Sequence, residues 1–423
     1  MDISIPYGHS TLSLKWDFPS QEVLSPQEGA AEAVPAACIS QAMARPVNSP
    51  LLEDLARDAK DAVILISDHT RPVPSRLILP PMLEALRRGN PRIRVTLLVA
   101  TGCHRETTGQ ELRAKLGDAL YERETVLVHD CDDQKNMVLL GTLPSGAPLW
   151  INRTAAETDL LLAEGFIEPH FFAGFSGGRK SVLPGVCSRE TVMRNHCAAL
   201  IDHPLARTGI LQGNPIHEDM AAAAKLAKLR YIVNVLLDAD KQVIHAVAGA
   251  PEEAHREGCR VMGALARIRP GRPGDIVITS NGGAPLDQNI YQAVKSLSTA
   301  EAAAAEGAAI IVCAACSDGI GGEQFYKALH DCVSPTALLE QIRTVPAEKT
   351  VPDQWQYQIL CRILEKHRVF FVTDPALKQA VEDMKMTWCE TLEEAVTQAA
   401  ALHPEGHAVI IPDGVCAICE TSR

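Results

Sequence analysis

The sequence predicts an α/β fold made of two α/β domains with mostly parallel sheets. The chain has 423 residues, which is too many for one ordinary hydrophobic core. Short, unbroken apolar segments alternate with longer helical patterns along most of the chain, as expected for βαβ units. A Pro- and Gly-rich segment at 269–274 interrupts this alternation, and we interpret it as a linker between the two domains.

The first half contains four apolar segments that predict buried parallel strands, at residues 61–66, 93–100, 125–129 and 159–163. After the first of them, Pro72 and Pro74 delay the next helix until about residue 76, so residues 68–71 are expected to form an exposed polar loop. Thr108, followed three residues later by Glu111, predicts a capping box at the start of a helix.

The second half repeats the βα pattern, with strands predicted at 275–279, 308–312, 369–372 and 408–411. A helix expected over 287–304 presents several polar side chains on one face. Residues 1–50 are expected to form a sheet edge or to wrap around the first domain. The predicted organisation is an N-terminal domain at 1–268, a linker at 269–274 and a C-terminal domain at 275–423.

A glycine-rich segment at 168–181 follows the apolar strand at 159–163, where an open α/β sheet binds ligands. A P-loop would need a glycine where Arg179 stands. A nucleophile elbow around Ser176 would need strand and helix to be joined directly, but about ten residues of loop intervene. The third interpretation, one wall of a nucleotide-cofactor site, is favoured because Arg179 and Lys180 add positive charge and His170 adds a base.

Polar side chains also follow the other predicted strands of the first half. Residues 68–71 come after one strand and His104 after the next, while His170 and Lys180 follow the fourth. A doubly wound sheet gathers such loops in one crevice. Each histidine alone would more often be structural than catalytic, but their position at strand ends favours a common site.

Composition excludes several classes of function. The net charge of −12 and the absence of a basic stripe argue against nucleic acid and anionic membranes as partners. No apolar run approaches the roughly 20 residues of a membrane span, and the first residues do not resemble a signal peptide. The 13 scattered cysteines suit a reducing compartment, so we expect a cytoplasmic protein.

The chain resembles the lactate racemase family, which uses the nickel-pincer nucleotide. The resemblance runs over nearly the whole chain, through the motifs at 67–72 (SDHTRP), 101–105 (TGCHR), 170–180, 195–196 and 291–295 (YQAVK). It implies an isomerase with its active site in the cleft between the domains. The implied substrate is a small 2-hydroxy acid such as lactate, and the implied partners include cofactor-assembly proteins.

The resemblance also assigns roles to residues. It implies that a Ni(II)-pyridinium-3,5-bisthiocarboxylic acid mononucleotide is linked covalently to Lys180, with His196 as the protein ligand to nickel. The cofactor-binding residues would be Asp68, His69, Thr70, Arg71, Lys180 and His196. The catalytic bases would be His104 and His170. The substrate-binding residues would be Arg71, Tyr291, Gln292, Lys295 and Trp355.

The implied chemistry suits these residue types. One histidine would take the hydroxyl proton while a hydride moves from C2 of the acid to the cofactor, and the planar 2-oxo acid would then receive the hydride on its other face. Two bases are needed because the enantiomers present their hydroxyls differently. Other 2-hydroxy acids, including malate and aromatic or sugar acids, remain open as substrates.

Alternatives of other classes also follow from the sequence. Ser176 could serve a hydrolase, or the chain could carry nickel or a cofactor without catalysis. The pairs Cys313–Cys316 and Cys416–Cys419 could form a four-cysteine zinc site, although separate thiols at strand ends are the preferred interpretation because the spacing between the pairs is long.

Overall fold

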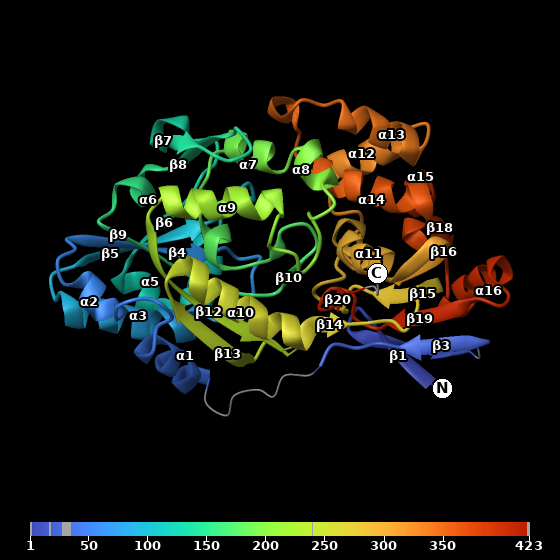
Figure 1. Cartoon of the computed structure of the whole chain (residues 1–423), viewed down its shortest axis with the longest axis horizontal. Helices are drawn as coiled ribbons and strands as arrows, with labels where there is room; N and C mark the ends of the chain where they lie inside the picture. Colours follow the sequence, from blue (N-terminus) through green and yellow to red (C-terminus); the bar gives the residue numbers. More distant parts are fainter. Residues whose placement is uncertain (1, 17, 28–34, 239, 421–423) are drawn as a thin grey trace.

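The computed structural model consists of two α/β halves lying side by side, each built on a six-stranded sheet (Figure 1). It describes all residues except 1, 17, 28–34, 239 and 421–423. The predicted class, two α/β units with mostly parallel sheets, is confirmed. No helix in the described residues is long and apolar enough to cross a membrane.

The first sheet has the strand order β13-β12-β9-β4-β5-β6, and every neighbouring pair is parallel except β12 and β13. Its strands are β4 (Asp61–Ser67), β5 (Arg94–Ala100), β6 (Thr125–Val128), β9 (Leu160–Phe166), β12 (Leu229–Leu237) and β13 (Val243–Gly249). One face packs in a core with α1 to α5, and the other with α7, α9 and α10. Because helices cover both faces, the central strands are largely apolar, which is the pattern that made them predictable.

The second sheet is entirely parallel, in the order β18-β17-β16-β15-β19-β3. Its strands are β3 (Ser20–Val23), β15 (Gly274–Ser280), β16 (Ala304–Cys313), β17 (Arg368–Val372), β18 (Thr387–Cys389) and β19 (His407–Ile411). The short pairs outside the two sheets are β1 (Asp2–Tyr7) with β2 (Ser10–Lys15), β7 (Met137–Thr142) with β8 (Pro148–Asn152), β10 (Pro169–His170) with β11 (Gly174–Phe175), and β14 (Arg267–Ile268) with β20 (Ile418–Cys419).

The helices fall into the two halves in chain order. Those of the first half are α1 (Pro35–Ala44), α2 (Leu52–Ala56), α3 (Ser75–Gly89), α4 (Gly109–Leu116), α5 (Asp118–Arg123), α6 (Arg153–Glu157), α7 (Arg189–Asn195), α8 (Ala198–Asp202), α9 (Pro215–Leu226) and α10 (Pro251–Ala266). Those of the second are α11 (Ile290–Ala303), α12 (Glu323–Asp331), α13 (Pro335–Arg343), α14 (Gln354–Lys366), α15 (Lys378–Asp383) and α16 (Leu392–Leu402). Short 3-10 turns are η1 (Gln134–Asn136), η2 (Gly178–Ser181), η3 (Ala347–Lys349) and η4 (Pro375–Leu377). The capping box expected at Thr108 is present at the start of α4.

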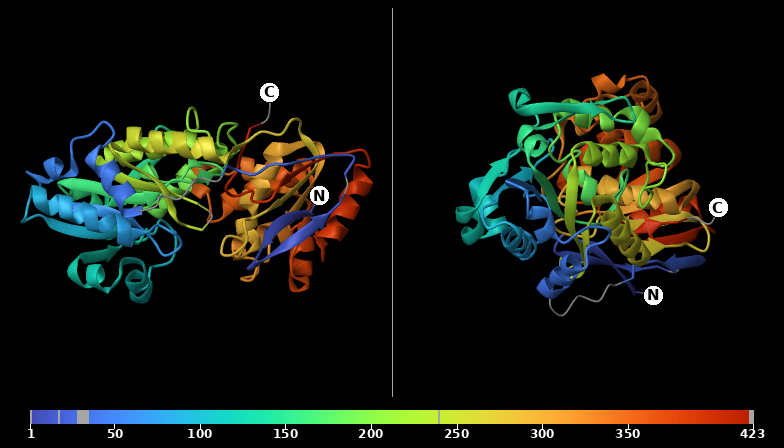
Figure 2. Two further views of the ribbon diagram at one scale, coloured as in Figure 1. Left: turned by 90° about the horizontal axis from the view of Figure 1, so that it is seen from below. Right: turned by 60° about the vertical axis from the view of Figure 1, so that its left-hand side comes forward.

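The N-terminal strands lie with the second half, where β3 forms a sheet edge, one of the two arrangements expected for residues 1–50. β3 pairs with β19, and the β1–β2 hairpin packs in the same core as β15 through Ile3 and Ile5. Figure 2 shows this blue hairpin against the orange and red half. The sequence could not reveal this placement because the strands that the hairpin covers lie more than 250 residues away in the chain. The boundary at 269–274 stays a prediction.

Direct contacts join the halves around α8 and α14. The side chain of Gln358, on α14, donates a hydrogen bond to the carbonyl of Ala198 at 2.9 Å. Arg343 at the end of α13 pairs with Asp202 at the end of α8, with an Nε–Oδ2 distance of 2.9 Å. These bonds fix the second half to the segment of the first that follows His196.

Replacing Ile5 with alanine should destabilise the second half, because this side chain is fully buried against β15 and its neighbours. We expect a loss of about 2–5 kcal/mol in unfolding free energy, measured by urea denaturation. Amide exchange should accelerate in β15 and β16. The control is Leu51→Ala, at a half-exposed position of the first half. Faster exchange confined to β4 and β5 would contradict the observed packing.

Candidate active site

The loop after β4 presents Asp68 to the carboxyl edge of the first sheet. Asp68 is 2% exposed, and its Oδ1 accepts bonds from the Thr70 hydroxyl at 2.7 Å and the Thr70 N–H at 3.1 Å. Its Oδ2 lies 2.7 Å from Nδ1 of His104. Burial alone would raise the Asp68 pKa, but the bond to His104 and the charges of His104 and Arg71 lower it to about 2. Asp68 is therefore an ionised acceptor that fixes the His104 ring.

His104 stands half-exposed at the end of β5, with its ring held on one side only. A carboxylate on Nδ1 leaves Nε2 of a neutral imidazole free to accept a proton, as in other Asp–His pairs of enzymes. His69 faces elsewhere, because its Nδ1 lies 3.0 Å from the Thr107 hydroxyl. The structure thus brings Asp68 and His104 together, while the His69 ring bonds Thr107.

His170 and Lys180 meet within the glycine-rich segment. The segment folds back through the β10–β11 pair, in which His170 is opposite Gly174. Nζ of Lys180 lies 3.1 Å from Nε2 of His170, and Nδ1 of His170 accepts the Ala173 N–H at 3.3 Å. Burial, then neighbouring positive charges, lowers both pKa values well below their usual ranges. The two nitrogens are therefore both favoured in their neutral forms.

Arg179 points into the protein and not toward the site, which corrects the expectation that its charge lines the cradle. The guanidinium is 4% exposed and donates to the carbonyls of Ala173, Ser176 and Gly177 at 2.8–3.3 Å. It also contacts His217 on α9 and His255 on α10 at 3.0 and 2.8 Å. A buried cation needs such partners, and here the loop's own carbonyls supply them.

Gly177 makes the turn of the segment possible. Its φ is +78°, and a Cβ there would lie 2.7 Å from the Phe166 carbonyl oxygen. The next N–H, of Gly178, donates to Oδ1 of Asn234 at 2.8 Å. The segment is therefore fixed to β12 directly before Lys180.

Ser176 serves the loop and not a hydrolase. Its hydroxyl donates to the Phe166 carbonyl at 3.1 Å and accepts the Glu168 N–H at 2.9 Å. Among the described residues, no histidine or carboxylate bonds the Ser176 hydroxyl. A nucleophilic serine needs an adjacent base, so this geometry counts against the hydrolase interpretation.

His196 lies at the end of α7 in an aromatic setting. Its Nδ1 lies 3.0 Å from the Val192 carbonyl, so Nδ1 carries the proton and Nε2 presents a lone pair. The ring is edge-on to Phe172 and to Trp355, with centroid distances of 5.1 and 5.0 Å. Burial, with the nearby charge of Lys180, lowers the His196 pKa to about 3, which keeps the ring neutral.

The helix α11 faces these groups from the second half. Lys295 is half-buried, and burial together with the charge of Arg71 lowers its pKa to about 8. Burial raises the Tyr291 pKa, and the Tyr291 ring packs edge-on against Phe325. For Gln292 the structure shows only a backbone bond, from its N–H to Oδ1 of Asn289 at 3.0 Å.

Among the predicted site residues, six form three contacting pairs, and two others lie near one of these pairs. The structure joins Asp68 with His104, His170 with Lys180, and His196 with Trp355. Arg71 and Lys295 are close enough to lower the pKa values of the His170 and Lys180 pair.

Two residues of the same segment were missed as site residues. The charge of Glu168 raises the pKa values of both Lys180 and Lys295, opposing their neutralisation. The Phe172 ring contacts His170, His196 and Lys180, with Nζ 5.7 Å from its centroid. Both residues lie inside the glycine-rich segment, and this position was the one feature of the sequence that could have identified them as site residues.

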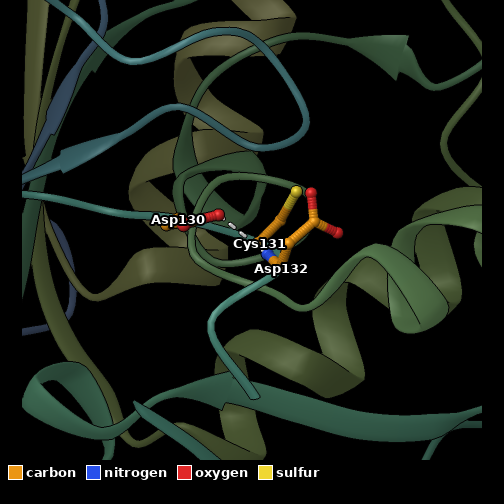
Figure 3. Close-up of side chains that lie close together, drawn as sticks. All are labelled: Asp130, Cys131 and Asp132. Atoms are coloured by element: carbon orange, nitrogen blue, oxygen red, sulfur yellow. Dashed lines mark hydrogen bonds between the residues drawn. The ribbon is translucent and has the colours of Figure 1, made fainter. Parts of the chain in front are cut away.

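Other candidate metal ligands do not form a convincing centre. All four cysteines of the C-x-x-C pairs are free, and they do not gather into a metal-ligand group in the described part of the chain. Figure 3 shows Asp130, Cys131 and Asp132, whose ligand atoms lie within 4.8 Å of one another. Oδ1 of Asp130 accepts the Asp132 N–H, and Arg189 binds both oxygens of Asp132 at 2.6–2.7 Å. Because both carboxylates have partners, we assign no metal to them.

Comparison with known proteins gives consistent matches over almost the entire chain. The family models of the lactate racemase N-terminal and C-terminal domains match residues 7–209 and 270–419. A lactate racemase of Thermoanaerobacterium thermosaccharolyticum is 47% identical over 423 residues, covering 99% of both proteins. One of Lactiplantibacillus plantarum is 48% identical over 378 residues, covering 89% of both.

Solved structures extend these matches. The lactate racemase apoprotein of T. thermosaccharolyticum superimposes with a TM-score of 0.96 at 46% identity, covering 99% of this chain and 100% of that one. A Thermotoga maritima protein has a TM-score of 0.64 at 18% identity, covering 93% of this chain and 100% of that one. The second match supports the fold alone.

The amine of Lys180 should react as a nucleophile at lower pH than an ordinary lysine, because its pKa is lowered by burial and by Arg179 and Arg71. Acylation of the apoprotein with limiting acetic anhydride, followed by peptide mass spectrometry, should give a Lys180 rate that levels off at lower pH than the rate of exposed Lys225. Urea-unfolded protein should show no difference. Equal pH profiles in the folded protein would contradict the neutral amine.

Proposed function

The chain belongs to the lactate racemase family, and from this premise we propose that it is an isomerase that interconverts the enantiomers of lactate. The observation that carries the proposal is the pairing of Lys180 with His170 at 3.1 Å, in a site that also presents His196. A neutral amine, a neutral base and a neutral imidazole ligand are the groups that a covalently held nickel cofactor and a hydroxy acid require.

The residues present fit the nickel-pincer nucleotide. His196 would ligate nickel through Nε2, since Nδ1 is committed to the Val192 carbonyl, and imidazole is a good ligand for Ni(II). Lys180 would carry the covalent link through its neutral amine. Residues 68–71 would line the cofactor on the opposite side. When bound, the cofactor would accept a hydride from C2 of the hydroxy acid and return it to the other face.

The protein's own part in the reaction is to move one proton and to orient the acid. His170 and His104 would each take the hydroxyl proton of one enantiomer and return it. A positive charge on Lys180 is the second cause, after burial, that lowers the His170 pKa, and a thioamide nitrogen at this position would stay uncharged at any pH. The covalent link would therefore exclude a cation beside His170 at any pH and leave this imidazole available as a base.

Cations at the cleft would hold the carboxylate of the substrate. Lys295 and Arg71 supply charge, Tyr291 and Gln292 supply hydrogen bonds, and Trp355 would form an apolar wall beside His196. A small aliphatic acid suits this arrangement, and lactate is the first candidate. Malate and aromatic or sugar acids are the alternatives. Loading of the cofactor would require assembly proteins in the host.

Protein co-expressed with the cofactor-assembly enzymes should convert D-lactate into L-lactate, as measured by chiral chromatography. The variant Lys180→Ala should form no L-lactate, because it cannot hold the cofactor covalently. If the parent protein with bound cofactor does not turn over lactate but does turn over 2-hydroxybutyrate, malate, phenyllactate or gluconate, the substrate assignment is wrong. Silence on all of them would favour a cofactor carrier.

The affinity for lactate should fall as the pH rises above 8. Lys295 has a pKa of about 8, so it is a cation below that pH and loses its charge above it. The KM should rise by up to about 10-fold per pH unit between pH 8 and 9.5. Lys295→Arg, which stays charged, should have a higher KM throughout but a flatter pH profile. Parallel profiles for parent and variant would contradict this role.

A further inference from the structure

The strand β9 contains one acid that the proposed chemistry does not use. All seven residues of β9 are buried, and Glu164, which is 0% exposed, is the one polar side chain of this strand. Burying a carboxyl group is costly unless it has hydrogen-bond partners. The contacts of Glu164 therefore indicate its role.

A single oxygen of Glu164 bonds both ends of the loop that carries Asp68 and Arg71. Oε1 accepts the hydroxyl of Ser75, the first residue of α3, at 2.6 Å. The same Oε1 accepts the N–H of Ser67, the last residue of β4, at 3.4 Å. Oε2 has no hydrogen-bond partner in the described structure. Glu164 Oε1 thus joins the two residues that flank the 68–74 loop.

Lys115, on α4, holds the same loop from a second direction. Its Nζ donates to the Arg71 carbonyl at 3.2 Å. Burial raises the Glu164 pKa, and the positive charge of Lys115 partly offsets this rise. The two side chains therefore interact electrostatically beneath the loop. These bonds attach both ends and the middle of the loop that carries Asp68.

We propose that Glu164 is a positioning residue that holds the 68–74 loop, and through Asp68 the His104 ring, in the geometry used for catalysis. This inference rests on the proposed function, since it names His104 as a catalytic base. The hydrogen bonds of Glu164 go to Ser67 and Ser75, and neither of these is a proposed substrate- or cofactor-binding residue. Its effect is transmitted through Ser67 and Ser75 to the loop between them.

The variants Glu164→Leu and Glu164→Gln separate this role from general stability. Glutamine retains an oxygen that can accept both bonds, whereas leucine has similar volume but no acceptor. In the apoprotein, hydrogen exchange of the amides at 68–71 should be markedly faster in Glu164→Leu and close to the parent rate in Glu164→Gln. In protein loaded with cofactor, kcat per bound cofactor should fall on the order of 10-fold or more only in Glu164→Leu.

A matched control is Glu124→Leu. Glu124 is a buried acid directly before β6, the edge strand of the same sheet, and it is bonded to Arg87 and Arg123. This variant should lower stability without accelerating exchange at 68–71. Ser75→Ala, which removes one of the two bonds, should show an intermediate effect on exchange.

Unchanged loop exchange in Glu164→Leu would overturn the proposal, and so would an equal loss in Glu164→Gln and Glu164→Leu. Exchange is measured on the apoprotein, so it decides whether Glu164 holds the loop even if the parent turns over no 2-hydroxy acid. Inactivity of the parent would instead overturn the proposed function. A loosened loop with unchanged kcat would show that Glu164 has a purely structural role.

Discussion

The site depends on one buried cation, Arg179, which determines the course of the glycine-rich segment. A guanidinium without a carboxylate partner in the described residues must be solvated by the protein, and three carbonyls of the segment wrap around it. Its neighbours His217 and His255 are kept neutral, since burial and Arg179 lower their pKa values. With Arg179 turned inward, the next side chain, Lys180, faces the opposite way, toward His170.

The parallel sheet then concentrates positive charge at one edge. Arg71, Lys180 and Lys295 reach the same region from two loops of the first half and one helix of the second. Burial and these charges together lower the pKa values of nearby bases, so the His170 imidazole and the Lys180 amine favour their neutral forms, whereas Lys295, with a pKa of about 8, stays a cation at neutral pH. The protein as a whole carries a net charge of −12, so this cationic region is a local feature suited to an anionic ligand.

Much of this arrangement could be predicted from the sequence, because apolar strands and Gly- and Pro-rich loops can be recognised from neighbouring residues alone. The strands that became β4, β5 and β9, and the polar residues after them, follow from such signals. Other features depend on contacts distant in the chain. Nothing near Ile5 indicates that it packs against β15, and composition suggests that Arg179 should be exposed. Only the fold shows that the Ser176 hydroxyl is hydrogen-bonded to the Phe166 carbonyl and the Glu168 N–H.

The contact between His196 and Trp355 joins the residue proposed to ligate nickel to the aromatic side chain proposed to lie beside the substrate. The two rings come from different halves of the protein, with centroids 5.0 Å apart. α8 begins two residues after His196, and Gln358, on the same helix as Trp355, bonds its first carbonyl. A shift of α14 would therefore move Trp355 and His196, the proposed substrate wall and the proposed nickel ligand, together. This coupling keeps groups from the two halves in register, because the ring contact of Trp355 and the hydrogen bond of Gln358 join the same helix to nearby positions of the first half.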